Sequence, residues 1–182
     1  TPSMRGDSPH ETPLHAGILP GMAQSRAEAT RQRIIDAVVI LFAENGYADT
    51  GLNDITAAAK VTTGAFYYHF ASKESVANAI IREGWPKAVE VLERWLDPTK
   101  AGLENIVVMT FALSELLKRD KFVWVSNHLN QAFGQLSESG RVEFKHKADT
   151  FVTRIADAIQ PSDIRDDVTR HEVGNSVWMI VH

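Results

Sequence analysis

The stretch from Val61 to Lys73, VTTGAFYYHFASK, restricts the fold of this chain more than any other. Thr62 is a typical helix N-cap, because its hydroxyl can accept a hydrogen bond from a backbone amide that has no partner inside the helix. Phe66 and Phe70 are four residues apart and share one face of such a helix. The pattern predicts a short helix that buries both phenylalanines and ends before Ser72, which caps the next helix.

The opposite face of this helix carries groups that can contact a nucleic acid. Tyr67, Tyr68 and His69 point away from the phenylalanines. Thr63 and Gly64 lie in the first turn, where backbone amides point outward and can bind a phosphate. A glycine there also lets a bulky partner approach the backbone. Each of these residues alone is more often core or solvated surface, but their joint order favours a helix that faces DNA.

The charge of the chain is less favourable for DNA binding. It carries 19 lysines and arginines against 23 aspartates and glutamates, a formal net charge of −4. From Met22 to Lys73 cations and anions are equal in number, so the acidic excess lies mostly after this segment. Lys73 is a cation at a helix start, where the dipole favours an anion, and a nearby phosphate would balance it. A neutral module binds DNA weakly as one copy, so we expect a homodimer.

Two helices are expected before Val61. The first begins at Arg26 and has Gly46 just past its end, and the second covers Leu52 to Ala59 with Gly51 at its cap. A tight turn at Lys60 joins the second helix to the one after Thr62, which makes a helix-turn-helix unit. The arginines of the first turns could contact phosphates or be solvated: Arg26, Arg31 and Arg33.

The segment from Arg26 to about Lys87 resembles the N-terminal domain of the tetracycline-repressor (TetR) family of bacterial transcriptional regulators. The residues that carry this resemblance are Ile35, Ala37, Phe42, Gly46, Tyr47, Ile55, Ala58, Thr62, Gly64, Ala65, Tyr67, His69, Phe70, Ser72, Lys73 and Glu74. The chain departs from the family pattern at three positions. Gly51 replaces the usual hydroxyl cap, Lys60 the usual turn glycine, and Thr63 a frequent lysine. We expect DNA contacts from Arg26, Thr62, Thr63, Gly64, Ala65, Tyr67, Tyr68, His69 and Lys73.

The resemblance implies an all-α protein with a helix-turn-helix DNA-binding domain and a helical bundle that binds an effector and dimerises. We place a flexible arm at residues 1–25, the DNA-binding domain at 26–87 and the bundle at 88–182. The part of the arm before Met22 is either native or vector-derived. The bundle is expected to be incomplete, because its last helix is still apolar where the sequence stops. A helix from Ser72 to Trp95, which kinks or restarts at Pro86, is expected to link the two domains. The bundle is then expected to contain a central helix Leu103–Leu117, a helix Lys121–Phe133, a loop Ser137–Gly140, a helix that ends at Pro161 and a last helix from Asp166 or Asp167.

An effector pocket follows from the resemblance, although ordinary core packing explains most of the same side chains. The candidates are Phe111, Phe122, Trp124, Asn127, His128, Gln131, Phe151 and Trp178. The GAFYYHFASKE run and the segment Ser162 to Arg165 also resemble the γ-butyrolactone receptor group. That group tends to place a tryptophan near the position of Lys147, where this chain has none.

Other classes of protein find no support in the sequence. It has no phosphate-binding loop, dinucleotide fingerprint or nucleophile elbow, so an enzyme is disfavoured. There are no cysteines, and the histidines lack metal-ligand spacing, so neither a metal nor a cofactor is expected. No apolar run approaches the ~20 residues of a membrane span, and we expect a cytoplasmic protein with operator DNA and a small effector as partners. The alternative is a module of the same fold that binds a ligand or protein with little specific DNA recognition.

Overall fold

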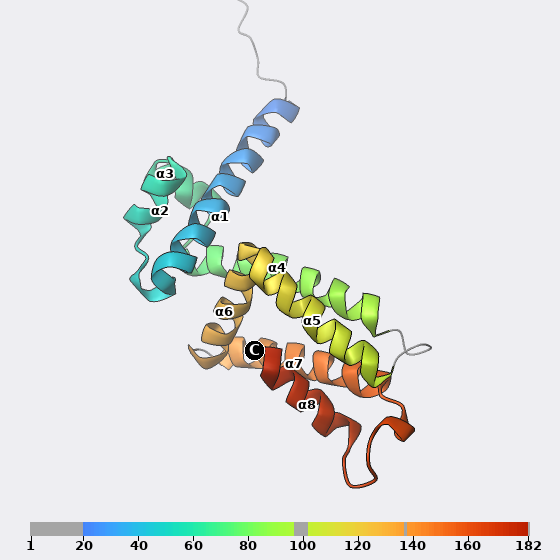
Figure 1. The fold of residues 1–182 in the computed structure, drawn as a ribbon. Coiled ribbons are helices and arrows are strands. Elements are labelled where there is room, and N and C mark those ends of the chain that lie inside the picture. The colour runs from blue at the N-terminus through green and yellow to red at the C-terminus, as the bar shows by residue number, and fades with distance from the viewer. Residues whose placement is uncertain (1–19, 97–101, 137, 182) are drawn as a thin grey trace, which may run out of the picture.

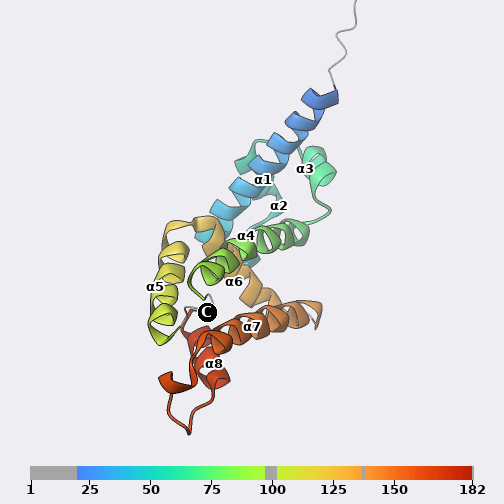
Figure 2. The ribbon, with the colours of Figure 1, turned by 90° about the vertical axis from the view of Figure 1, so that its right-hand side faces the viewer.

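The computed structural model describes residues 20–96, 102–136 and 138–181, and all regular elements in these ranges are helices (Figure 1). In chain order they are α1 (Pro20–Asp49), α2 (Leu52–Ala59), α3 (Thr63–His69), α4 (Lys73–Trp95), α5 (Leu103–Arg119), α6 (Lys121–Leu136), α7 (Glu138–Ala158), a 3₁₀ turn (Pro161–Asp163) and α8 (Arg170–Val181). The predicted all-α class is confirmed. Viewed from the side, α1 to α3 lie at one end, α7 and α8 at the other, and α4 between them (Figure 2).

The helix ends around α3 follow the local chemistry of the sequence. The α2 helix ends at Lys60, which takes a left-handed conformation with φ 52° and ψ 49°, the conformation that glycine adopts at least cost. The Thr62 hydroxyl accepts a hydrogen bond from the Ala65 amide at 3.1 Å. Ser72 caps α4 in the same way through the Ser75 amide. The predicted boundaries of α2 and α3 are therefore confirmed.

Two groups of buried apolar side chains hold the helices together. The N-terminal core is formed by α1 to α4 and receives Val125, Leu129 and Phe133 from α6. The C-terminal core is formed by the end of α4 with α5, α7 and α8, and Phe151 and Trp178 pack edge to face within it. The α4 helix thus contributes to both cores and connects the two ends of the molecule.

Three predicted helix starts are wrong, whereas helix α4 runs from its Ser72 cap to Trp95 as predicted and passes Pro86 without a restart. Helix α1 begins at Pro20 rather than Arg26, since proline is favourable in a first turn. Helix α7 already begins at Glu138, where a loop was expected. Helix α8 begins at Arg170, because Thr169 and Glu172 form a capping box that the sequence reading missed.

Helix α5 is not central in the bundle as predicted. Its buried face carries Ile106, Met109 and Leu113. A second apolar stripe on the same helix points outward, with exposed fractions of 42% for Leu103, 50% for Val107 and 70% for Phe111. The helix is amphipathic toward the core but apolar on part of its outer face as well, so periodicity alone did not show which stripe is covered.

Helices α4 and α6 approach closely at Gly84. A Cβ atom at this position would lie 2.2 Å from the Ser126 Oγ and 2.3 Å from the Ser126 Cβ. The Ser126 hydroxyl donates to the Ile81 carbonyl at 3.4 Å. Gly174 has a similar role between α8 and α7, since its Cβ would lie 2.8 Å from the Val152 carbonyl oxygen. Both glycines are required by helix contacts.

The start of α6 is fixed to α4 by Asp120. Its carboxylate accepts hydrogen bonds from the Val123 amide at 3.1 Å and from the Lys87 ammonium at 2.7 Å. Partial burial raises the pKa of Asp120, but the bonds from Lys87 and Val123 and the charge of Lys87 outweigh this effect, so the net pKa is lowered. The carboxylate therefore stabilises the fold when it is ionised.

Candidate nucleic-acid interface and internal cavity

The outer face of α3 has the arrangement that the sequence predicts. Phe66 is fully buried and Phe70 nearly so. Tyr67 is 54% exposed and Tyr68 is 78% exposed, so both hydroxyls face solvent. His69 is half-buried and packs edge to face against the ring of Tyr68 at 4.9 Å. The helix thus presents two tyrosines together with the exposed Thr62, Thr63 and Gly64 at its start.

Gly64 differs from the packing glycines because, among the described residues, no other element packs against it. An added Cβ would meet only the Thr62 Oγ1, at 4.0 Å. Among the described residues, positive φ angles occur only at Gly46 and Lys60, so Gly64 has a backbone that alanine can adopt. The fold itself therefore does not require a glycine at position 64.

Lys73 has a different environment from the one predicted. Its ammonium donates to the Tyr47 carbonyl at 2.7 Å and to the Thr50 carbonyl at 2.9 Å, and it lies 4.2 Å from the centre of the Tyr47 ring. The end of α1 thus supplies the negative dipoles that balance this cation at the start of α4. The explanation by a nearby phosphate is not needed, and the side chain primarily joins α1 to α4.

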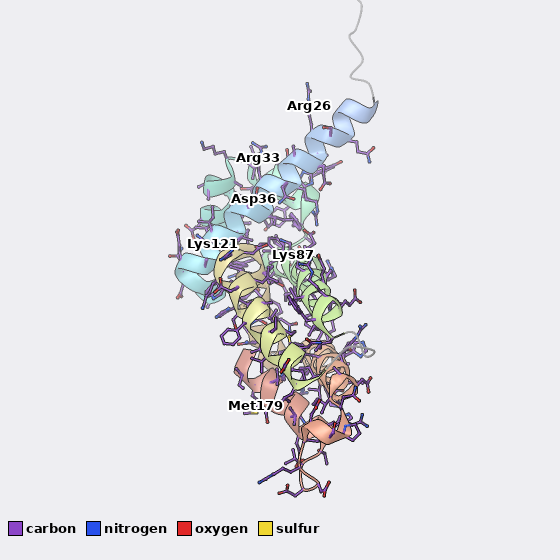
Figure 3. All side chains as sticks on the ribbon, turned by 45° about the vertical axis from the view of Figure 1, so that its right-hand side comes forward. Arg26, Arg33, Asp36, Lys87, Lys121 and Met179 are labelled. Atoms are coloured by element: carbon purple, nitrogen blue, oxygen red, sulfur yellow. The ribbon has the colours of Figure 1, made fainter. Side chains whose placement is uncertain are left out.

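The three arginines of α1 are not equivalent. Arg31 forms an ion pair with Glu83 of α4 at 2.6 Å and lies 5.5 Å from the Phe70 ring centre. Arg26 and Arg33 are exposed and project from the N-terminal half of α1 (Figure 3). Among the described cations from Pro20 to His69, Arg26, Arg33 and Lys60 are therefore the exposed ones.

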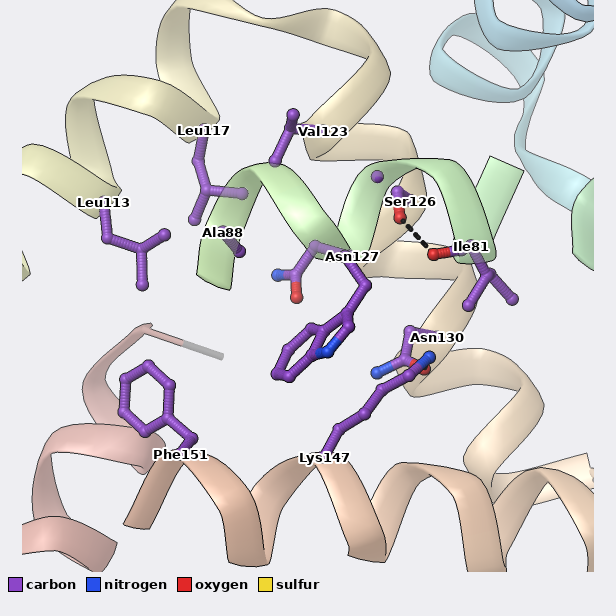
Figure 4. A pocket seen from close by; sticks show the side chains of 12 residues that line it. Ile81, Ala88, Leu113, Leu117, Val123, Ser126, Asn127, Asn130, Lys147 and Phe151 are labelled. Carbon is purple, nitrogen blue, oxygen red and sulfur yellow. Dashed lines mark hydrogen bonds between the residues drawn. The ribbon is translucent and has the colours of Figure 1, made fainter. Parts of the chain in front are cut away.

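An internal cavity lies between α4, α5, α6 and α7 (Figure 4). Its volume of ≈ 30 Å³ holds about one or two water molecules. The lining residues are mainly apolar, with a few polar groups: Ile81, Gly84, Trp85, Ala88, Leu113, Leu117, Val123, Ser126, Asn127, Asn130, Lys147 and Phe151. An apolar cavity with few polar groups is typical of small-molecule sites.

A larger, open groove of ≈ 650 Å³ lies between the end of α1 and helices α5, α6 and α8. Four of the predicted pocket residues lie along it: Trp124, Asn127, His128 and Gln131. The rings of Trp124 and His128 stack with centres 3.8 Å apart, and the His128 Nδ1 lies 2.9 Å from the Trp124 carbonyl oxygen. Asn127 lines both the groove and the internal cavity.

The other four predicted pocket residues lie in four different places. Phe151 lines the internal cavity. Phe122 packs against the N-terminal core and Trp178 lies in the C-terminal core. Phe111 is 70% exposed on α5, so its predicted place in the interior is wrong.

Lys147 and Trp85 are two of the ten cavity residues that were not predicted from the sequence. The Lys147 Nζ donates to the Asn130 Oδ1 at 2.9 Å and lies 5.7 Å from the centre of the Trp85 ring. Burial lowers the pKa of Lys147, while the charge of Glu143 acts in the opposite direction. A signal was available, because Lys147 occupies the apolar stripe of α7 between Phe144 and Phe151. Trp85 of α4 thus lies beside Lys147 in the wall of the cavity.

In the described parts of the chain, no helix is both long and apolar enough to cross a membrane. Within the same ranges, no three histidines or acidic residues come together as a metal site would need.

Solved structures with the same architecture include receptors and DNA-bound regulators. The crystal structure of a γ-butyrolactone receptor (ArpA-like protein) superposes with a TM-score of 0.71 at 30% identity, covering 87% of this chain and 83% of that one. The TetR family protein CprB from Streptomyces coelicolor, solved in complex with its biological operator sequence, gives a TM-score of 0.67 at 31% identity, covering 86% of this chain and 78% of that one.

Sequence similarity is concentrated in the first helices. Residues 34–80 match the family described as bacterial regulatory proteins, tetR family. The A-factor receptor protein of Streptomyces griseus is 47% identical over 60 residues, which are 33% of this chain and 22% of that receptor. The chain therefore matches about a fifth of the length of this curated relative. These similar proteins are regulators and receptors rather than enzymes, in agreement with the absence of catalytic motifs.

Proposed function

Since the chain belongs to the TetR family of bacterial transcriptional regulators, which bind DNA, we propose that it is a repressor that binds a pseudo-palindromic operator as a homodimer and is released by a small apolar effector. In this proposal residues 26–87 form the DNA-binding domain and residues 88–182 bind the effector and dimerise. A regulator of this kind acts where the chromosome is, which places the protein in the cytoplasm.

The position of α4 is the observation that carries this proposal. Its first half packs in the N-terminal core through Val76, Ala77 and Ile80. Its second half lines the internal cavity through Gly84 and Trp85. Because one continuous helix belongs to both regions, a ligand that displaces its second half also moves α1 to α3. Release of DNA requires that the ligand prefers the displaced arrangement.

The DNA contacts of the proposal come from the exposed side of α3. We propose that Thr62, Thr63, Gly64 and Ala65 approach the duplex through the start of the helix. Side-chain contacts come from Tyr67, Tyr68 and His69, with phosphate contacts from Arg26. Lys73 contributes mainly by holding α4 against the end of α1. Two copies of α3 would enter successive major grooves, roughly 34 Å apart.

The effector is proposed to bind in the internal cavity. Two of the similar proteins are named as receptors, one for γ-butyrolactone and one for A-factor, which supports a small, largely apolar effector. The ≈ 30 Å³ cavity has to enlarge for any such molecule. Since Trp85 is only partly buried, its displacement from the wall is the movement we propose to admit the ligand.

Fluorescence anisotropy on DNA selected by the protein from a random library tests this function. We expect a few related, inverted-repeat sequences, tight binding by a dimer and a strong dependence on salt. Enrichment of no sequence, or equal affinity for selected and scrambled fragments, contradicts the proposal.

A second candidate function is supported by the engagement of Arg31 and Lys73 in contacts within the protein. Fewer free cations lower the electrostatic affinity for DNA, which favours a module that binds a ligand or a protein with little specific DNA recognition. Genome-wide binding profiles distinguish the two, since the regulator predicts a few sharp sites and the module predicts none.

A further inference from the structure

Lys147 is a cation in an otherwise largely apolar site. It extends from α7 toward Asn130 of α6 (Figure 4), with a hydrogen bond of 2.9 Å between the Lys147 Nζ and the Asn130 Oδ1. Among the described residues no carboxylate lies within 4 Å of this ammonium, although Glu143 is one turn away on α7. The ammonium has three donors, and the amide oxygen of Asn130 carries no net charge to compensate it.

The surroundings of this cation make its charge costly. Trp85, Leu113, Leu117 and Phe151 form the apolar part of the cavity. Lys147 is half-buried, and partial burial of a charge that no contacting anion compensates is unfavourable, so the group responds with a shifted pKa. The pKa of Lys147 is indeed lowered, with burial as the largest cause. An anion placed beside the ammonium would remove this cost, whereas a neutral carbonyl group would add only a hydrogen bond.

We propose that Lys147 makes the cavity selective for an apolar molecule that carries a carboxylate group. The carboxylate accepts hydrogen bonds from the Lys147 ammonium and from the side-chain amide of Asn130, while the apolar part of the molecule takes the space beside Phe151 and Leu113. This inference rests on the proposed effector function, because it names the chemical class of the effector.

The position of the site favours a response of the whole molecule to such an anion. Lys147 and Asn130 belong to α7 and α6, and Gly84 and Trp85 of α4 line the same cavity. The Lys147 Nζ lies 5.7 Å from the centre of the Trp85 ring, and the cavity of ≈ 30 Å³ holds only about one or two water molecules. A molecule with its carboxylate on Lys147 and Asn130 therefore needs Trp85, and with it α4, to move aside. The helix that is displaced is the one shared with the N-terminal core.

Matched pairs of acids and amides test the proposal. Isothermal titration of the full chain with indole-3-acetate and indole-3-acetamide, 4-phenylbutanoate and 4-phenylbutanamide, and octanoate and octanamide compares equal shapes with and without the charge. We expect at least one acid to bind roughly tenfold or more tightly than its amide, the difference that one charged hydrogen bond provides. Equal affinity within every pair, or no binding of any acid at millimolar concentration, overturns the proposal.

Two variants assign the preference to a residue. Lys147→Met keeps the length of the side chain without the charge and is expected to abolish the preference for the acid. Lys145→Met is the matched control, because Lys145 is exposed on the same helix and pairs with Asp149; it is expected to leave the preference unchanged. A preference for the acid that survives in Lys147→Met overturns the proposal. If this variant does not fold, the comparison of acids with amides on the wild-type protein still tests the proposal.

Separate measurement of DNA affinity distinguishes this inference from the proposed function. If the protein binds the acid selectively but binds no specific DNA, the inference about the carboxylate is supported and the proposed regulator function is contradicted. If the protein binds specific DNA but binds acids and amides equally well, the regulator function is supported and the inference about the carboxylate is contradicted.

Discussion

Replacement of Gly64 by alanine tests directly whether the start of α3 approaches DNA. The added methyl group would meet only the Thr62 Oγ1, at 4.0 Å, and the backbone angles suit alanine. Because alanine favours helix more than glycine, we expect the free energy of unfolding to stay the same or to rise by up to about 1 kcal/mol. The same methyl group would stand between the helix backbone and the duplex. A steric cost of roughly 1–3 kcal/mol lowers the affinity about 5- to 150-fold.

The assay combines urea unfolding with fluorescence anisotropy on a fragment that the wild-type protein selects. Gly84→Ala is the matched control, since its Cβ would lie 2.2 Å from the Ser126 Oγ. That change is expected to destabilise the protein by roughly 1–3 kcal/mol. The reasoning is refuted if Gly64→Ala binds the fragment as tightly as the wild type, or if it loses stability as Gly84→Ala does.

Three further substitutions have outcomes that follow from single contacts. Lys73→Met removes the donor to the Tyr47 and Thr50 carbonyls, so we expect urea unfolding to show a loss of roughly 1–3 kcal/mol and anisotropy to show an equal weakening on all DNA sequences. Asp120→Ala removes the carboxylate that accepts from the Val123 amide, at a cost of about 1 kcal/mol. Because the pKa of Asp120 is lowered from 3.8 in the fold, this difference from the wild type is full above pH 3.8 and shrinks as the pH falls through the folded pKa. Gly174→Ala places a Cβ 2.8 Å from the Val152 carbonyl oxygen, so we expect thermal unfolding to reveal a loss of roughly 1–3 kcal/mol.

Each of these expectations has an outcome that opposes it. If Lys73→Met keeps full stability but loses DNA affinity, the result would support a direct contact between Lys73 and a DNA phosphate. A pH-independent difference between wild type and Asp120→Ala from pH 6 to pH 2 would remove the role of the ionised carboxylate. For Gly174, the matched control is Asn175→Ala at the neighbouring exposed position, and equal stability of the two variants would contradict the close contact of α7 and α8.

The helix-turn-helix unit was predictable because its determinants are local. The Thr62 cap, the pair Phe66 and Phe70, and the break at Lys60 all act within a few residues. The capping box of Thr169 and Glu172 was equally readable and was missed, which displaced the predicted start of α8. Continuation of α4 through Pro86 could not be predicted locally, because packing on both sides of the proline compensates for the lost hydrogen bond.

The partners of charged residues were the least predictable part of the site. Arg31 pairs with Glu83, and Lys73 donates to the carbonyls of Tyr47 and Thr50. These partners are far apart in the sequence, so no local sequence pattern predicts them. The same holds for the cavity, where Lys147 meets Asn130 from another helix. Apolar spacing also failed to predict the burial of Phe111. An apolar residue at helical spacing can lie on an uncovered helix face as well as in the core.

Footprinting of the wild-type protein on its selected DNA fragment tests the central claim most directly, namely that the exposed face of α3 reads the major groove. The account predicts two protected segments related by inverted symmetry, with centres roughly 34 Å apart, and loss of both in Gly64→Ala while the variant remains folded. Protection spread evenly along the fragment, or an unchanged footprint in Gly64→Ala, would contradict it.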